Sequence, residues 1–502
     1  MTLQPIEDDR EVVPRWRSYS DAKSSVELAP LRQAHLVAAE KELGPLRAQY
    51  SSSHDAFVIA DYLGALIAYQ VDQRTIEPVA HALAAVSEEG SVLWGFARQA
   101  IQLSDDASPD QLEPASIDAH ARLQLRALRH VIRRSPRRAT FHVDAALAHA
   151  TLGNRKSANR EARIALELAP TNRFVVRSAA RLLISQDEPD EAAWILRHFG
   201  SYASDPWVLA PLMSAMQLAG EKPTEFRAAR ELSALGNHSA ADLAELWAEM
   251  ATIELGAGKT KAARGLFRSS LQNPNDNVVA QAEWASKAGG FTLSEADLSV
   301  ERGYEARSRA FAREAKWSQS VIEGQAWQRD EPFSLEPALS TSYIAALVLE
   351  DYQKALDVAS SGLNFHPKDP TLRNNAAFAA AKLGDTEKAR EHLRHAGHAA
   401  GSDERNAMVA TRGLIAFRDG QPAVGRALYT QAVNEFRRAG NADMSVLASS
   451  LWALEELRIQ SPIALNARDA AQEDFARAQL PEAKVLVNRV EAAFSSAESA
   501  EL

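Results

Sequence analysis

Apolar residues recur every three or four positions along most of the chain, which is the spacing of one face of an α-helix. One such face carries Leu243, Trp247, Met250 and Ile253, at steps of 4, 3 and 3 residues. After Gly258 a second helical pattern begins, and it runs up to a proline. The local unit is therefore a helix, a glycine turn, a second helix and a proline stop.

This unit recurs with a fixed spacing of small residues. Steps of 7, 5 and 7 residues separate the marker positions in two segments, which are Ala146, Gly153, Ala158 and Ala165 in the first and Ala377, Gly384, Ala389 and Ala396 in the second. The step from Ala355 to Ala389 spans 34 residues. Small residues let helices approach closely, and glycine takes the left-handed conformation in which a helix ends and the chain reverses. Since one helix pair cannot bury its apolar face alone, the pattern predicts a stack of pairs.

These segments resemble the tetratricopeptide repeat (TPR) family. The resemblance implies an all-α fold, a right-handed superhelical solenoid of antiparallel helix pairs. It covers most of residues 139–440, and the marker pattern is most complete in 139–172 and 370–403. Two positions depart from the pattern, because Asp187 stands where the turn glycine is expected and Gly425 replaces the usual alanine.

The phase of the repeats predicts five segments. We expect an N-terminal segment, divergent TPR-like helices, two TPR sub-arrays and C-terminal capping helices, at 1–52, 53–135, 136–287, 291–440 and 441–502 respectively. The repeat phase breaks near Gly289 and Gly290, which makes this point a candidate hinge between the sub-arrays. Residues 103–116 are rich in turn formers and predict a linker.

Composition narrows the classes of function. The 502 residues are 46% hydrophobic and 24% charged, as in ordinary soluble proteins, and include no cysteine. This excludes disulfides, cysteine-ligated zinc, iron–sulfur clusters and a thiol nucleophile. The net charge of -10 argues against whole-surface attraction to nucleic acid or anionic lipid. The chain begins without an apolar signal core, and no apolar run is long enough to span a bilayer, so we expect a cytoplasmic protein without a membrane partner.

The stretch LGAGKT at 255–260 has the ending of a phosphate-binding P-loop. The first glycine of that motif would stand at position 253, which is Ile253, and a helical pattern precedes the stretch where a P-loop needs a strand. Gly258 is therefore interpreted as a helix-reversing turn, and no nucleotide is expected. The chain also lacks the nucleophile-elbow, zinc-protease, EF-hand and dinucleotide motifs. We expect no enzymatic activity and no cofactor, and we interpret the three histidines His392, His395 and His398 as packed or solvated rather than as metal ligands.

The resemblance further implies that the first helix of each unit lines a concave groove in which ligands bind. On this sequence that face carries Arg177, Arg181, Arg302, Arg309, Arg313, Asn374, Phe378 and Lys382. Because arginines dominate this set, we expect the groove to bind an acidic helix or extended segment of a protein partner. The alternative is pairing within a helix, since Glu305 lies three residues after Arg302 and four before Arg309.

Two features lie outside the clear repeats. Trp16 stands between two arginines, and it either docks on this chain or anchors a partner. A basic stripe of arginines at steps of 4, 3 and 4 precedes the first clear repeat, at Arg122, Arg126, Arg129 and Arg133.

The first hypothesis for function is a non-enzymatic scaffold or adaptor that binds a protein partner as a subunit of a multiprotein complex. One alternative is a nucleic-acid-binding accessory subunit that uses the basic region 122–138. A second alternative is a peptide-sensing regulator of an effector.

Overall fold

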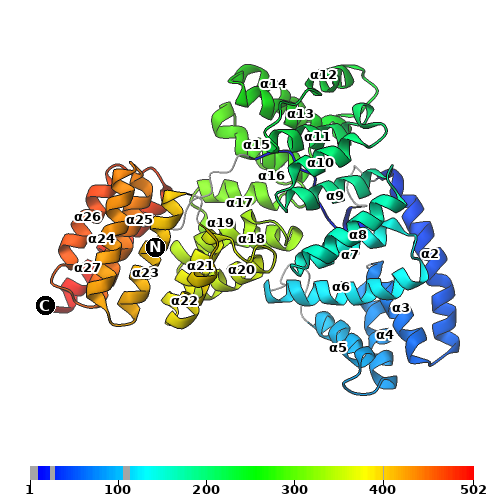
Figure 1. The fold of residues 1–502 in the computed structure, drawn as a ribbon, viewed down its shortest axis with the longest axis horizontal. Coiled ribbons are helices and arrows are strands. Elements are labelled where there is room, and N and C mark those ends of the chain that lie inside the picture. Colours follow the sequence, from blue (N-terminus) through cyan, green and yellow to red (C-terminus); the bar gives the residue numbers. More distant parts are fainter. Residues whose placement is uncertain (1–9, 23–28, 70, 106–113, 399–400, 502) are drawn as a thin grey trace. The chain divides into compact units, whose positions relative to one another are not determined.

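The computed structural model describes residues 10–22, 29–69, 71–105, 114–398 and 401–501. Within these residues the regular structure is helical and includes no strand, so the predicted all-α fold is confirmed (Figure 1). Parts of two predicted segments, residues 1–9 and 106–113, lie outside the described residues. No helix in the described part of the chain is long and apolar enough to cross a membrane. The chain divides into two compact units, which are described one at a time.

The N-terminal unit comprises described residues 10–307 and 329–333. Its helices are α1 (Tyr19–Ala22), α2 (Ala29–Ser52), α3 (Ala56–Ala68), α4 (Gln73–Val86), α5 (Val92–Asp105), α6 (Pro114–Arg134), α7 (Ala139–Thr151), α8 (Arg155–Leu168), α9 (Arg173–Ile184), α10 (Pro189–Arg197), the short η3 (Tyr202–Ser204), α11 (Pro206–Leu218), α12 (Phe226–Ala234), α13 (Ala240–Gly256), α14 (Thr260–Ser270), α15 (Asp276–Gly289) and α16 (Glu295–Leu298). The start of α17 (Tyr304–Arg313) and the end of α18 (Trp317–Asp330) also belong to it.

The reversals between paired helices use the left-handed backbone, as the sequence predicts. Gly153 joins α7 to α8 with φ of 71°, and Gly258 joins α13 to α14 with φ of 75°. The P-loop-like stretch is thus a helical turn, in which Lys259 Nζ lies 2.8 Å from Glu254 Oε2. Asp187, which replaces a turn glycine, still adopts φ of 64° between α9 and α10. The turn geometry is therefore kept where the sequence departs from the repeat pattern.

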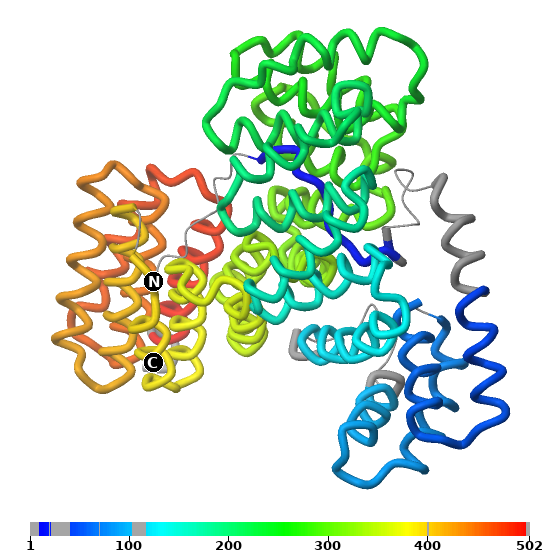
Figure 2. The backbone as a smooth tube through the Cα atoms, turned by 45° about the vertical axis from the view of Figure 1, so that its right-hand side comes forward, coloured from blue at the N-terminus to red at the C-terminus, as the bar shows by residue number. Residues whose placement is uncertain are grey.

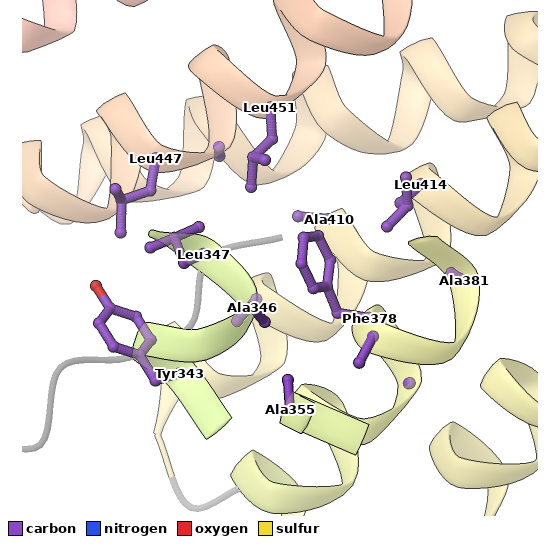
Figure 3. Packing of buried hydrophobic residues seen from close by; sticks show 14 of the residues in the cluster. Tyr343, Ala346, Leu347, Ala355, Phe378, Ala381, Ala410, Leu414, Leu447 and Leu451 are labelled. Atoms are coloured by element: carbon purple, nitrogen blue, oxygen red, sulfur yellow. The ribbon is translucent and has the colours of Figure 1, made fainter. Parts of the chain in front are cut away.

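The C-terminal unit comprises described residues 308–328 and 334–501. Besides its parts of α17 and α18 it contains α19 (Glu336–Leu347), α20 (Tyr352–Phe365), α21 (Pro370–Lys382), α22 (Thr386–His395), α23 (Ser402–Arg418), α24 (Pro422–Arg438), α25 (Ala442–Arg458), α26 (Ala464–Phe475) and α27 (Pro481–Glu501). Figure 3 shows the core that joins successive pairs, where Leu347, Phe378 and Leu414 come from the first helices α19, α21 and α23. At its end, Arg489 of α27 donates to the backbone oxygens of Leu347 and Val348 at 2.9 and 2.7 Å.

The second departure from the repeat pattern has a steric reason. Gly425 lies where α23 and α24 approach each other, and a Cβ built there would stand 2.5 Å from the Phe417 ring and 2.9 Å from the carbonyl oxygen of Gly413. Even the alanine that the pattern prefers would collide with these groups. Glycine at this position permits the close helix contact.

We expect Gly384→Val to destabilise the C-terminal unit by about 1–2 kcal/mol, because a side chain with a Cβ is strained in the left-handed region. Gly384 has φ of 91° between α21 and α22, and a Cβ there meets nothing within 4 Å, so the cost is conformational rather than steric. Thermal unfolding followed by circular dichroism measures it. The matched control is Gly265→Val, which lies inside α14 with open space around it and without a positive φ. Equal melting temperatures for the two variants would contradict the expectation.

Candidate functional site in the N-terminal unit

Residues 10–22, called here the N-terminal strap, run along the first helices of the repeat pairs in the N-terminal unit. The strap has no regular structure before Tyr19, and in Figure 2 it is the dark blue tube that passes among the cyan and green helices. Its contacts come from α7, α9, α11, α13 to α15, α17, the end of α18 and the residues that follow α18. These contacting residues together are called the strap site.

Side chains of the strap site bind the main chain of the strap. Asn277 Nδ2 donates to the carbonyl oxygen of Val13 at 2.9 Å, and Gln281 Nε2 donates to that of Arg10 at 2.7 Å. At the other end, the backbone N–H of Tyr19 donates to Asp144 Oδ1 at 2.7 Å. Because these bonds involve backbone atoms, they can hold an extended segment whatever its side chains are.

Arg10 is the first of three strap arginines bound by carboxylates. Its Nε donates to Glu305 Oε1 at 2.6 Å, and its Nη2 donates to Glu305 Oε2 at 3.0 Å, which makes the pair bidentate. Asn277 and Gln281 also accept hydrogen bonds from the same guanidinium. A planar guanidinium satisfied on both edges in this way is held in one orientation.

Arg15 and Arg17 share a second set of carboxylates. Arg15 contacts Glu331, lies 2.6 Å from Glu305 Oε2 and 3.1 Å from Asp276 Oδ2. Arg17 lies 2.6 Å from Asp276 Oδ2 and 2.5 Å from Asp330 Oδ2. The side chains in these pairs are 12% exposed or less, so little water screens the charges.

The charges hold each other in the ionised form. Burial alone would raise the pKa of Asp276, but Arg17 and Arg15 outweigh burial and lower it. Burial likewise opposes the charge of Glu331, and Arg15 and Arg181 outweigh it, so the pKa of Glu331 is also lowered. Removing one member of such a buried set leaves its partners uncompensated, which costs about 3–5 kcal/mol.

Apolar contacts fix the strap between its charged ends. Trp16 is 1% exposed, and its ring centroid lies 5.0 Å from that of Phe333. Val12 is fully buried in a cluster with Phe267 and other residues of α13 to α15. The ring of Tyr19 meets the edge of Phe174 at 5.2 Å. Trp16, for which the sequence left two roles open, is therefore docked on its own chain in this structure.

The arginines that the sequence assigned to the groove face of this unit lie at the strap site or beside it. Arg177 is 1% exposed and donates to Glu245 Oε2 at 3.0 Å. Arg181 lies 3.7 Å from Glu331 Oε1 and stacks over Phe333. Arg302 pairs with Asp21 of the strap at 3.0 Å. These three arginines pair with carboxylates of their own chain in this structure.

The remaining groove candidates belong to the C-terminal unit. Arg309 lies over the Trp327 ring at 5.6 Å, and Arg313 is exposed. Phe378 is part of the core at 1% exposure. Asn374 accepts from Thr411 Oγ1 at 2.7 Å, and Lys382 donates to Glu455 Oε1 at 2.9 Å. Asn374, Phe378 and Lys382 are thus engaged in packing within the unit.

The basic stripe lies on α6. Arg122 is exposed and pairs with Asp118, whereas Arg133 contacts His130 and Asp61. Arg126 and Arg129 face a cavity between helices, which is considered further below.

The histidines of α22 show no metal geometry. His392 is buried, and its Nδ1 lies 3.2 Å from Arg373 Nη1. Within the ranges that the structure describes, no group of three or more His, Asp or Glu side chains is placed to hold a metal ion.

Sequence reasoning missed the acidic half of the strap site. The carboxylates that contact or surround the strap are Asp144, Glu245, Glu249, Asp276, Glu305, Asp330 and Glu331. Two of them, Glu245 and Glu249, lie four residues apart on the first helix of a pair, and so on one face of that helix. The same reasoning that assigned the arginines to the groove face could therefore have assigned these two carboxylates to it. The basic Pro-Arg-Trp-Arg stretch at 14–17 was the complementary signal.

Comparisons with known proteins identify no relative of this chain in sequence. No family model matches the chain, and no curated protein matches its sequence. Among solved structures it is similar to the Cut9–Hcn1 heterotetramer of APC/C, at 14% identity and a TM-score of 0.35 over 94% of this chain and 96% of that one. It is also similar to yeast Tom70, at 12% identity and a TM-score of 0.29 over 93% and 97%.

A third similar structure is Naa15/Naa10 bound to HypK-THB, at 12% identity and a TM-score of 0.23 over 94% and 97%.

The class of this protein follows from its own helix pairs, their left-handed turns and the small residues at their contacts. It is an all-α protein of helix pairs whose sequence resembles the TPR family.

Proposed function

We propose that this protein is a non-enzymatic, cytoplasmic scaffold that binds a protein partner through the strap site, as a subunit of a multiprotein complex. The partner contributes an extended segment in which arginines flank an aromatic residue. The N-terminal strap is the internal occupant of the site, and it is displaced when such a partner binds.

One observation carries the proposal, namely the way in which the site holds the strap. Amide side chains bind the strap backbone, buried carboxylates bind its arginines, and an apolar recess takes its tryptophan. Backbone bonds supply affinity for any extended chain, whereas the carboxylates and the recess select basic and aromatic side chains. A site that recognises one segment of this chain in this way recognises a partner segment of the same chemistry.

The acidic partner expected from the sequence is the competing proposal. It fits the exposed cations Arg313 and Arg122 better than the strap site, where carboxylates surround the ligand. Nucleic acid binding by region 122–138 is weakened because Arg134 and Arg138 are paired with Asp61 and Glu42. Both alternatives predict ligands of the opposite charge to the one proposed.

The test uses a fluorescent peptide with the sequence of residues 10–22 and the full-length Trp16→Ala variant, in which strap docking is weakened. We expect saturable binding of the peptide to the variant and at least tenfold weaker binding to the wild-type chain, whose own strap competes. A peptide with glutamate in place of Arg15 and Arg17 is the matched control and is expected not to bind. Tighter binding of this acidic control would overturn the proposal in favour of the acidic partner.

A further inference from the structure

A second feature of the N-terminal unit is a cavity of about 920 Å³ between α5, α6, α7 and α8, called here the α5–α8 cavity. Its volume lies in the range of small-molecule sites, roughly 300–1,000 Å³. It is separate from the strap site, because none of the residues that contact the strap is among those that line it. The cavity therefore has to be explained independently of the proposed function.

The walls of the α5–α8 cavity are mostly apolar. Hydrocarbon and aromatic side chains come from all four helices, and they include Leu93, Phe96, Leu128, Ile132, Ala145 and Ile164. Val92, also in the lining, is 79% exposed. An apolar wall of this extent favours a ligand with a hydrocarbon or aromatic body, since each buried methylene contributes about 0.8 kcal/mol.

The polar groups of the cavity are predominantly cationic. Arg126, Arg129 and Arg133 of α6 line it together with Arg160 of α8, and Glu161 is the one carboxylate among the lining residues. Glu161 is already engaged, because His142 Nδ1 lies 2.8 Å and Arg160 Nη2 2.9 Å from its oxygens. The charge that remains for a ligand is positive.

Two of these arginines have no counter-charge in the described part of the chain. Arg133 contacts Asp61 and His130, and Arg160 contacts Glu161. Arg126 and Arg129 form no ion pair or hydrogen bond with any described residue, in contrast to the arginines of the strap. Two unpaired guanidiniums on successive turns of α6 can bind the two oxygens of one anionic group.

His149 is a further polar residue of the cavity wall. His149 of α7 lines the cavity and is 9% exposed, and its Nδ1 is buried without a hydrogen-bond partner among the described residues. Burial lowers the pKa of His149, and Arg129 lowers it further, so the ring is neutral at pH 7 and can donate one hydrogen bond without carrying charge.

We propose that the α5–α8 cavity binds a small amphipathic anion, with its carboxylate or phosphate head on Arg126 and Arg129 and its hydrocarbon body along the apolar wall. Single-stranded nucleic acid is the less suitable ligand, because it requires aromatic faces for stacking and the one aromatic ring other than histidine in the lining, Phe96, is 1% exposed. The site gives the scaffold a small-molecule input that is distinct from its protein ligand.

Calorimetric titration of the full chain with four probes tests the proposal, each kept below the concentration at which micelles form. The probes are dodecanoate, dodecyl phosphate, dodecanol and inorganic phosphate. We expect saturable one-site binding of dodecanoate or dodecyl phosphate, and the tighter of the two identifies the head group. Dodecanol, which lacks the charge, and inorganic phosphate, which lacks the body, are expected to bind at least tenfold more weakly. Equal binding of dodecanol, or no saturable binding of either anionic amphiphile, would overturn the proposal.

Paired variants locate the site. The double variant Arg126→Met and Arg129→Met keeps the apolar stems and removes the charges, and we expect it to weaken binding of the anionic amphiphile at least tenfold. Arg122→Met is the control, because Arg122 lies on the same helix outside the cavity and pairs with Asp118. Equal affinity of the double variant and the control would refute the assignment. So would binding of a single-stranded oligonucleotide that depends on Arg126 and Arg129 while the amphiphiles do not bind. Circular dichroism of the variants establishes that each one is folded.

Discussion

Trp16→Ala is expected to release the N-terminal strap. Trp16 is 1% exposed and packs on Phe333, beside Val143 and Val175. Truncating a buried tryptophan to alanine costs about 3–5 kcal/mol, which corresponds to about a hundredfold or more in the docking equilibrium. Because Trp16 belongs to the strap, the loss weakens the docking of the strap on these helices.

Limited proteolysis with trypsin measures the release, because the strap carries cleavage sites after Arg15 and Arg17. When docking and undocking are fast, the rate of cleavage follows the undocked population. We expect these sites to be cleaved about a hundredfold faster in the variant than in the wild type. Trp194→Ala is the matched control, since Trp194 lies in the same unit, is 58% exposed and stacks only on His198.

A second variant at Trp16 distinguishes release of the strap from unfolding of the whole protein. Trp16→Phe keeps an aromatic ring against Phe333 and removes the indole N–H, which is buried and has no hydrogen-bond partner among the described residues. We expect it to be cleaved more slowly than Trp16→Ala. If Trp16→Ala and Trp16→Phe are both cleaved at the wild-type rate, the strap is not held by Trp16.

The second large effect is a dependence of strap docking on pH. Burial raises the pKa of Asp144 to about 7, although the backbone N–H of Tyr19 acts in the opposite direction. Burial also raises the pKa of Glu249 to about 7, opposed by hydrogen bonds from Ser214 and from the backbone of Val12 and by the charge of Arg10. Two carboxyl groups in contact with the strap therefore take up protons near neutral pH when the strap is docked.

The sign of the effect follows from these raised values. A group whose pKa is higher in the docked state contributes stability that is fully present below its undocked pKa and is lost as the pH rises from there through the docked pKa of about 7. If the undocked pKa is the ordinary value near 4, docking weakens about tenfold per group between pH 6 and pH 8. Asp276 and Glu331 have lowered pKa values and act in the opposite sense, since their contribution is lost as the pH falls through the acid range. Docking is thus strongest at about pH 4 to 5 and weakens continuously from there to about pH 8.

Fluorescence anisotropy can follow this change, because the chain has no cysteine of its own and a dye can be attached to the single thiol of a Ser18→Cys variant. We expect the anisotropy to fall between pH 6 and pH 8 as the strap is released. Combining Asp144→Asn and Glu249→Gln keeps the hydrogen-bonding shape and removes both ionisable groups, so the pH dependence is expected to disappear. An unchanged pH profile in that combination would assign the effect to other groups.

The pH response and the proposed ligand exchange concern the same contact. If a partner segment displaces the strap as proposed, conditions that weaken docking make the site more accessible to that partner. The α5–α8 cavity lies outside this competition, and strap release and amphiphile binding can be measured separately.

Local features of the sequence were sufficient to predict the helical architecture. Turn residues and apolar periodicity act over a few residues, and they placed the reversals at Gly153, Gly258 and Gly384. They also excluded a P-loop at 255–260, since a helix occupies the place of the required strand. The sequence could not show why position 425 requires glycine, because the requirement depends on how closely α23 and α24 approach each other.

The candidate site was decided by the tertiary structure. Arg10 and Glu305 are 295 residues apart in the chain, and Arg177 and Glu245 are 68 apart, so no local pattern connects them. The sequence showed which residue types lie on the first helices, and it selected arginines for an acidic partner. Stacking the helix pairs brought carboxylates from several repeats against those arginines and against the strap. Periodicity determines which face of a helix is buried, whereas the order in which helices stack determines which charges meet.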